Sequence, residues 1–171
     1  MTNYSLTEIE THCRKAARGA GYHWGEVNDF GMAVRWLCAN GIDGTGEALK
    51  MLQVVDANCD VHRPSADALQ GATHPAICGL SLGCTLADRG LTALQDTTLN
   101  TPIIAPLIAY GVVCNAHAQV NRPALGALLG IDVRTSAPQT YVSDAVWTAL
   151  NDFVHRTYVP ATEESRLKGA G

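Results

Sequence analysis

The first forty residues carry apolar side chains at helical spacing, divided by glycines. Ser5 and Glu8 have the spacing of a capping box, in which each side chain bonds the backbone N–H of the other residue at a helix start. Small and apolar residues then recur every three or four positions until Gly19, a residue typical of helix ends. The pattern predicts one helix over 6–18 and a second over 24–39.

Further along the chain the patterns are mixed. Thr45 is predicted to cap a third helix over 46–54, and Pro106 to open another over 107–114, because proline fits the first helical turn. A last helix is predicted over 144–156. Alternating small and apolar residues predict short strands over 77–87, 99–105, 117–120 and 128–134, and residues 65–69 are expected to form one helical turn.

Helices at both ends with short strands between them indicate an α+β or α/β fold. The 171 residues suffice for one well-buried domain, so we expect a single domain over 1–171. Its N-terminal part is a helical layer and its C-terminal part a helix, with residues 159–171 as a turn and mobile tail.

Charged residues make up only 16% of the chain, well below the usual quarter. Few charges are available to cover the surface of so small a protein, which predicts a homo-oligomer that buries part of it. The net charge of -4 argues against nucleic acid as a partner. No apolar run is long enough to span a membrane, so we expect no membrane partner.

The six cysteines follow an N-terminus without the features of a signal peptide, so we expect reduced thiols in a cytoplasmic protein. Two Cys-x-x-His pairs, Cys59 with His62 and Cys114 with His117, offer zinc-ligand chemistry. They lack the tight Cys-x-x-Cys knuckle of structural zinc modules, so we predict no bound metal and no cofactor. A Cys-His nucleophile is a second interpretation of these residues, and the favoured alternative is buried core cysteines with surface histidines. The candidate nucleophile pairs are Cys114 with His117, and His74 with Cys78 or Cys84.

The glycine-containing break after the first helix has the elements of an anion site. Arg18 precedes Gly19 and Gly21, and the next helix begins near Trp24, close to Glu26. Backbone N–H groups at glycines and helix starts bind anions, so these five residues are predicted to bind a ligand. The alternative is a helix–turn–helix corner whose glycines only make the turn.

A second polar cluster lies near the C-terminus. Glu163 could act as a base and Arg166 could clamp a carboxylate, with Ser165 as a further ligand contact. Chain ends are often close in compact domains, which would place Arg166 and Arg18 around one anion. The alternative is a solvated terminal turn.

Four motifs resemble a bacterial family of small proteins known only as a domain of unknown function. They are Ser5-Leu-x-Glu-Ile-Glu, Lys15-Ala-Ala-Arg-Gly-Ala-Gly-x-x-Trp-Gly, Arg35-Trp-Leu and Thr157-Tyr-Val-Pro-Ala-Thr-Glu-x-Ser-Arg with a terminal Gly-Ala-Gly. The resemblance implies no activity. A weaker likeness links the first helices to the malate/L-lactate dehydrogenase family that is unrelated to Rossmann enzymes. That family carries a catalytic histidine where this chain has Gly44-Thr-Gly, so the activity is not carried over.

These observations favour a small cytoplasmic protein that binds a small anionic metabolite, with an enzymatic role in peripheral metabolism left open. The alternative is a non-catalytic accessory subunit that docks on a larger enzyme through the glycine-rich ends. The first function predicts a pocket where Arg18, Trp24 or Arg166 meets a carboxylate. The second predicts a flat apolar surface.

Overall fold

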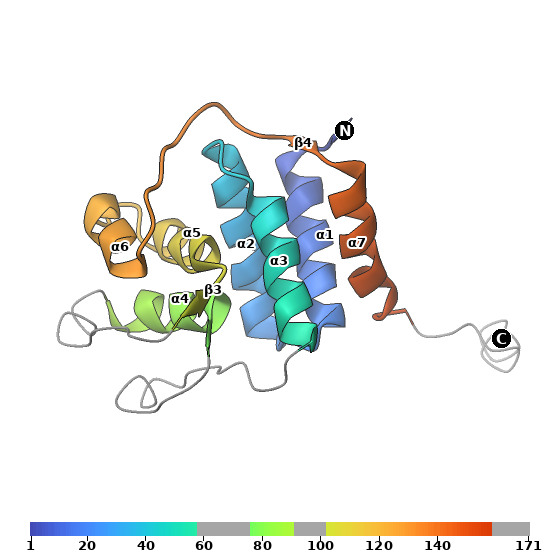
Figure 1. The fold of residues 1–171 in the computed structure, drawn as a ribbon, viewed down its shortest axis with the longest axis horizontal. Helices are drawn as coiled ribbons and strands as arrows, with labels where there is room; N and C mark the ends of the chain where they lie inside the picture. Colours follow the sequence, from blue (N-terminus) through green and yellow to red (C-terminus); the bar gives the residue numbers. More distant parts are fainter. Residues whose placement is uncertain (58–75, 91–101, 159–171) are drawn as a thin grey trace, which may run out of the picture.

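The computed structural model describes residues 1–57, 76–90 and 102–158. This part of the chain forms seven helices and four two-residue strands (Figure 1). The helices are α1 (Leu6–Gly19), α2 (Trp24–Ala39), α3 (Gly44–Ala57), α4 (Gly79–Arg89), α5 (Pro106–Ala116), α6 (Arg122–Leu129) and α7 (Asp144–His155). The strands are β1 (Thr2–Asn3), β2 (Ile77–Cys78), β3 (Ile103–Ile104) and β4 (Tyr141–Val142).

Four helices, α1, α2, α3 and α7, stand side by side, and α4, α5 and α6 pack beyond α2 (Figure 1). The helix α5 contacts both α2 and α4 and so joins the two groups. Strands β1 and β4 pair antiparallel, which places α7 beside α1, and the two helices run in the same direction. Strands β2 and β3 form a second, parallel pair.

The predicted helices at both ends of the chain are confirmed, and α2 has the predicted bounds. The capping box forms, with Glu8 N donating to Ser5 Oγ at 3.2 Å and Ser5 N donating to Glu8 Oε2 at 2.8 Å. The prediction that Thr45 caps α3 was wrong. Asp43 Oδ1 accepts from Gly46 N at 2.8 Å, while Thr45 is buried in the first turn. The α+β class is confirmed, with helices far in excess of strands.

The strand predicted over 77–87 was wrong beyond its first two residues, because the segment continues as α4. Its small residues serve helix packing rather than strand alternation. A Cβ at Gly83 would lie 2.8 Å from Ala109 Cα, and one at Gly79 would meet the carbonyl of Ala105. These glycines let α4 approach α5 closely, which periodicity alone does not reveal.

Two further strand predictions were wrong. Residues 117–120 form a loop, and the start of the segment 128–134 belongs to the end of α6. Asn121 Oδ1 caps α6 by accepting from Ala124 N at 3.1 Å, and Gly130 ends it with a φ of 69°. The predicted strand over 99–105 is present only as β3, with 99–101 outside the described residues. The predicted turn over 65–69 also lies outside them.

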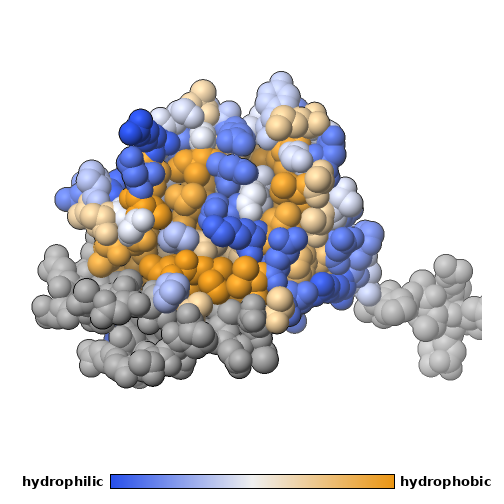
Figure 2. All heavy atoms as spheres, viewed as in Figure 1, coloured by the Kyte–Doolittle hydropathy of each residue, from blue (hydrophilic) through white to orange (hydrophobic). Residues whose placement is uncertain are grey.

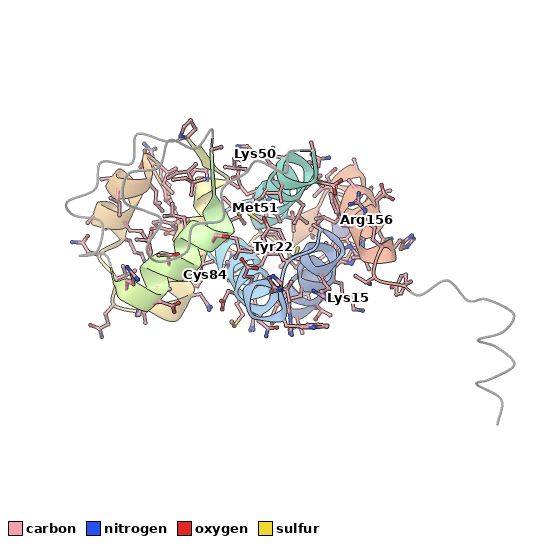
Figure 3. All side chains as sticks on the ribbon, turned by 90° about the horizontal axis from the view of Figure 1, so that it is seen from below. Lys15, Tyr22, Lys50, Met51, Cys84 and Arg156 are labelled. Atoms are coloured by element: carbon pink, nitrogen blue, oxygen red, sulfur yellow. The ribbon has the colours of Figure 1, made fainter. Side chains whose placement is uncertain are left out.

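The buried apolar residues of the described segments form one cluster. Within it the Tyr22 hydroxyl lies 3.1 Å from Cys78 Sγ, which in turn lies 4.0 Å from Met51 Sδ. Figure 3 labels Tyr22 and Met51. None of the described helices combines the length and apolar character needed to cross a membrane. The single domain over 1–171 stays a prediction, because 159–171 lie outside the described segments.

Candidate functional site

At the predicted anion-binding corner between α1 and α2, the side chains of Arg18 and Trp24 stack on each other. The Arg18 guanidinium lies 4.8 Å from the centre of the Trp24 ring, and Trp24 is 68% exposed. Arg18 Nη1 donates to the carbonyl of Tyr22 at 2.8 Å, which fixes the guanidinium over the turn. Arg18 therefore has a structural partner at this corner, although its side chain remains exposed.

The two glycines of this corner have structural roles. A Cβ at Gly19 would overlap the carbonyl of Phe153, so glycine is required for the close approach of α1 and α7. Gly21 has a φ of 90°, in the left-handed region that glycine adopts readily. The structure thus gives both glycines the packing and turn roles of the alternative reading.

Glu26 forms hydrogen bonds with residues other than Arg18 and Trp24. Its Oε2 accepts from His23 N at 3.2 Å and its Oε1 accepts from the Ser81 hydroxyl at 3.3 Å, so the carboxylate links α2 to α4. The remaining site residues predicted from the sequence are in the C-terminal segment outside the described residues. They are Glu163, Ser165 and Arg166.

The groove between α1 and α7 is a stronger candidate for a small-molecule site. It has a volume of about 370 Å³ and lies on the side of these helices away from α3, where Figure 3 shows Lys15. Its residues come from one face of each helix and from the segments flanking them. They are Tyr4, Ser5, Thr7, Glu8, Thr11, His12, Lys15, Trp147, Asn151, Val154 and Tyr158.

Three aromatic rings form the wall of this groove. The rings of Tyr4 and His12 both stack on Trp147, with centroid distances of 3.7 and 3.9 Å. Burial lowers the pKa of His12, and the nearby ammonium of Lys15 lowers it further, while the backbone of Trp147 partly offsets these effects. His12 is therefore neutral at pH 7, and the wall is an uncharged aromatic surface.

Two opposite charges flank this wall along α1. Lys15 is exposed and makes no ion pair with any described residue. Glu8 is ionised at neutral pH, because its hydrogen bonds with Ser5 lower its pKa. Asn151, which is half-buried on α7, adds an amide that no described side chain or backbone group engages. The groove thus offers cationic, anionic and neutral polar groups around an apolar centre.

A second cleft, of about 280 Å³, lies between α2, α4 and α5. The Cys84 thiol donates to Asp29 Oδ2 at 3.5 Å, and Asp88 and His117 line the same cleft. Burial raises the pKa of Asp29, and the neighbouring carboxylates of Asp88 and Glu26 raise it further. The cleft is acidic and contains no lysine or arginine among its described lining residues.

Cys114 and His117, the Cys-x-x-His pair within the described residues, have different surroundings. Cys114 is buried, which raises its pKa, whereas His117 is exposed with its Nε2 at 2.7 Å from the carbonyl of Ala87. Burial also raises the pKa of Cys84, so both thiols are protonated at neutral pH, which disfavours a thiolate nucleophile. Across the described segments no three His, Cys, Asp or Glu side chains are arranged to hold a metal ion. Outside those segments lie Cys59, His62 and His74.

Sequence reasoning missed the α1–α7 groove. Glu8, His12 and Lys15 lie at spacings of four and three, which places them on one face of a helix, and this signal was available. Trp147 and Asn151 share a face of α7 for the same reason. The sequence held no indication that these two faces meet.

Residues 4–70 match a protein family described as "Protein of unknown function (DUF3726)". The predicted resemblance to a family of unknown function is thereby confirmed for this segment, which contains α1 and the glycine corner. The motif that begins at Thr157 lies beyond the matched residues. No curated protein and no solved structure matches the chain.

Proposed function

We propose that this protein binds a small organic carboxylate in the groove between α1 and α7. The observation that carries the proposal is the ammonium of Lys15, which no described residue pairs with, beside the aromatic wall of His12 and Trp147. An ammonium at the rim of an apolar groove favours an anion whose body is apolar. This retains the predicted anionic metabolite and replaces Arg18 with Lys15 as the cation. The cytoplasmic setting is part of the proposal, because reduced thiols persist there.

Hexanoate is a suitable probe, since it combines a carboxylate with a short apolar body. Backbone amide shifts of the isotope-labelled protein should move in α1 and α7 as hexanoate is added, and 1-hexanol should produce weaker changes. Lys15→Gln should weaken hexanoate binding about fivefold, as expected for losing one partly exposed charge pair. Lys50→Gln is the matched control, because Lys50 pairs with Glu47 on α3 at 3.6 Å. Equal effects of the two substitutions would count against the groove.

A second function, docking on a larger protein, is favoured by Trp24. An exposed tryptophan with an arginine stacked on it belongs to the residue types that dominate binding energy at protein interfaces. We propose this corner as the contact of an accessory subunit. If this corner is the docking contact, a partner that co-purifies with the wild-type chain should no longer co-purify with the Trp24→Ala variant. The partner should be retained with Tyr141→Ala, which removes an aromatic ring of similar exposure, 61%, on β4.

A further inference from the structure

We infer that the ligand of the α1–α7 groove is an extended zwitterion: an amino-carboxylate whose two charges are separated by several bonds and joined by an apolar body. The inference rests on the proposed function and extends it. It follows from three features of the groove: the position of Glu8, the position of Lys15, and the surface between them.

Glu8 and Lys15 lie at opposite ends of the same helical face. They are seven residues apart, so their Cα atoms are separated by about 10 Å along the axis of α1. Helical side chains lean toward the N-terminus, and Glu8 does so as it accepts from Ser5 N, so both side chains shift the same way and the two charges stay well separated along the groove. Both residues line the groove, so one ligand can contact both.

Glu8 keeps one carboxylate oxygen for a ligand. Its Oε2 accepts from Ser5 N at 2.8 Å, and within the described chain no hydrogen bond reaches Oε1. The capping box fixes this carboxylate at the first turn of α1, so little conformational entropy is lost when a cation binds there. A ligand ammonium at Glu8 would form a charge-assisted hydrogen bond with a carboxylate that is already in place.

The surface between the charges is mainly aromatic. His12 lies between Glu8 and Lys15 on the helix, and its ring stacks on Trp147 at 3.9 Å. Because His12 is neutral at pH 7, this surface suits methylene groups rather than a third charge. The groove presents a carboxylate, an aromatic surface and an ammonium in that order. An ω-amino acid can lie along it with its ammonium at Glu8, its methylene groups on the aromatic surface and its carboxylate at Lys15.

Two simpler ligand classes match this layout less well. An α-amino acid holds its charges only about 3 Å apart and reaches one of the two residues but not both. A simple carboxylate leaves Glu8 without a cation and places a second negative charge in the same groove. An amino-carboxylate with five methylene groups spans about 7 Å, and a hydrogen-bond contact of about 3 Å at each end lets it reach two charges about 10 Å apart.

The test compares four probes on the full chain by amide shifts and calorimetry: 6-aminohexanoate, hexanoate, hexylamine and glycine. We expect 6-aminohexanoate to bind at least fivefold more tightly than any of the other three. Glu8→Gln should abolish the preference for 6-aminohexanoate over hexanoate, because it removes both the partner of the ligand ammonium and the negative charge that disfavours hexanoate. Glutamine serves in a capping box as well as glutamate does, so this variant keeps the helix start. Lys15→Gln should weaken the binding of both hexanoate and 6-aminohexanoate.

The outcomes separate this inference from the proposed function. The assignment of a zwitterionic ligand is wrong if hexanoate binds in the groove as tightly as 6-aminohexanoate. It is also wrong if Glu8→Gln leaves the ratio of the two affinities unchanged. In both cases the proposed binding of a carboxylate stands. If neither carboxylate shifts residues of α1 and α7, both are wrong. Thr148→Ala, on an exposed face of α7, controls for nonspecific effects of substitution and should bind all four probes as the wild type does.

Discussion

The carboxyl group of Asp29 makes the stability of the fold depend on pH. It is half-buried against Cys84, and burial raises its pKa above the ordinary value of 3.8. The folded state therefore binds a proton more tightly than the unfolded state. This contribution stabilises the fold below pH 3.8 and is lost as the pH rises through the raised pKa of the folded state.

Asp29→Asn should therefore stabilise the protein at pH 7, because the amide can still accept from Cys84 without a buried charge. The advantage over the wild type should shrink as the pH falls toward 3.8. Urea unfolding at several pH values measures it. Asp132→Asn is the control, since Asp132 pairs with Arg134 at an exposed position and such pairs contribute little. An advantage that grows as the pH falls would contradict a raised pKa of Asp29 in the folded state.

One glycine, Gly19, lies where α1 approaches the backbone of α7. A methyl group at Gly19 would overlap the backbone of Phe153, and backbone cannot turn aside as a flexible side chain can. Since the same two helices form the walls of the groove, separating them would change the candidate site as well as stability.

Gly19→Ala should lower the free energy of unfolding by about 2 to 3 kcal/mol, the upper part of the range for overpacking, because the clash is with backbone. Gly21→Ala is the matched substitution two residues away. It meets no atom within 4 Å and only has to adopt a φ of 90°, so we expect a loss of about 1 kcal/mol. Urea denaturation of both variants checks the difference. Equal losses would show that the turn matters and the helix contact does not.

The surface of the whole protein bears on its assembly. Figure 2 shows hydrophobic residues gathered on the face that includes α2, α3 and β3. Among the described residues the large apolar side chains with high exposure are Met1, Trp24, Tyr141 and Tyr158. Exposed apolar side chains, together with a charged fraction of only 16%, favour the prediction that part of this surface forms an interface between subunits.

Light scattering coupled to size exclusion should therefore give a mass of at least twice 18.1 kDa at micromolar concentration. The mass should fall toward that of one chain on dilution if the interface is of modest area, because association depends on protomer concentration. A species of one chain at every concentration would show that the few charged residues suffice to keep the surface soluble.

The helices at both ends could be predicted from the sequence, because helix formation is governed by neighbours three and four residues apart. Ser5 and Glu8 mark the start of α1, and the glycine at position 19 follows its last turn, so α1 was predicted to within one residue. The same local rules failed for α4. Its glycines satisfy contacts with α5, a partner more than twenty residues away, and their pattern locally imitates a strand.

The amino-acid sequence by itself determined where α1, α2 and α7 lie, that the chain carries few charges, and that Lys15 and Arg18 stand before a glycine turn. Only the tertiary structure decided which of these cations faces a cavity. Pairing of β1 with β4 sets α7 along α1, which brings Trp147 onto His12 and leaves Lys15 at the rim, while Arg18 stacks on Trp24. The physical reason is that a binding site needs side chains about 140 residues apart to converge, and local spacing carries no information about that distance.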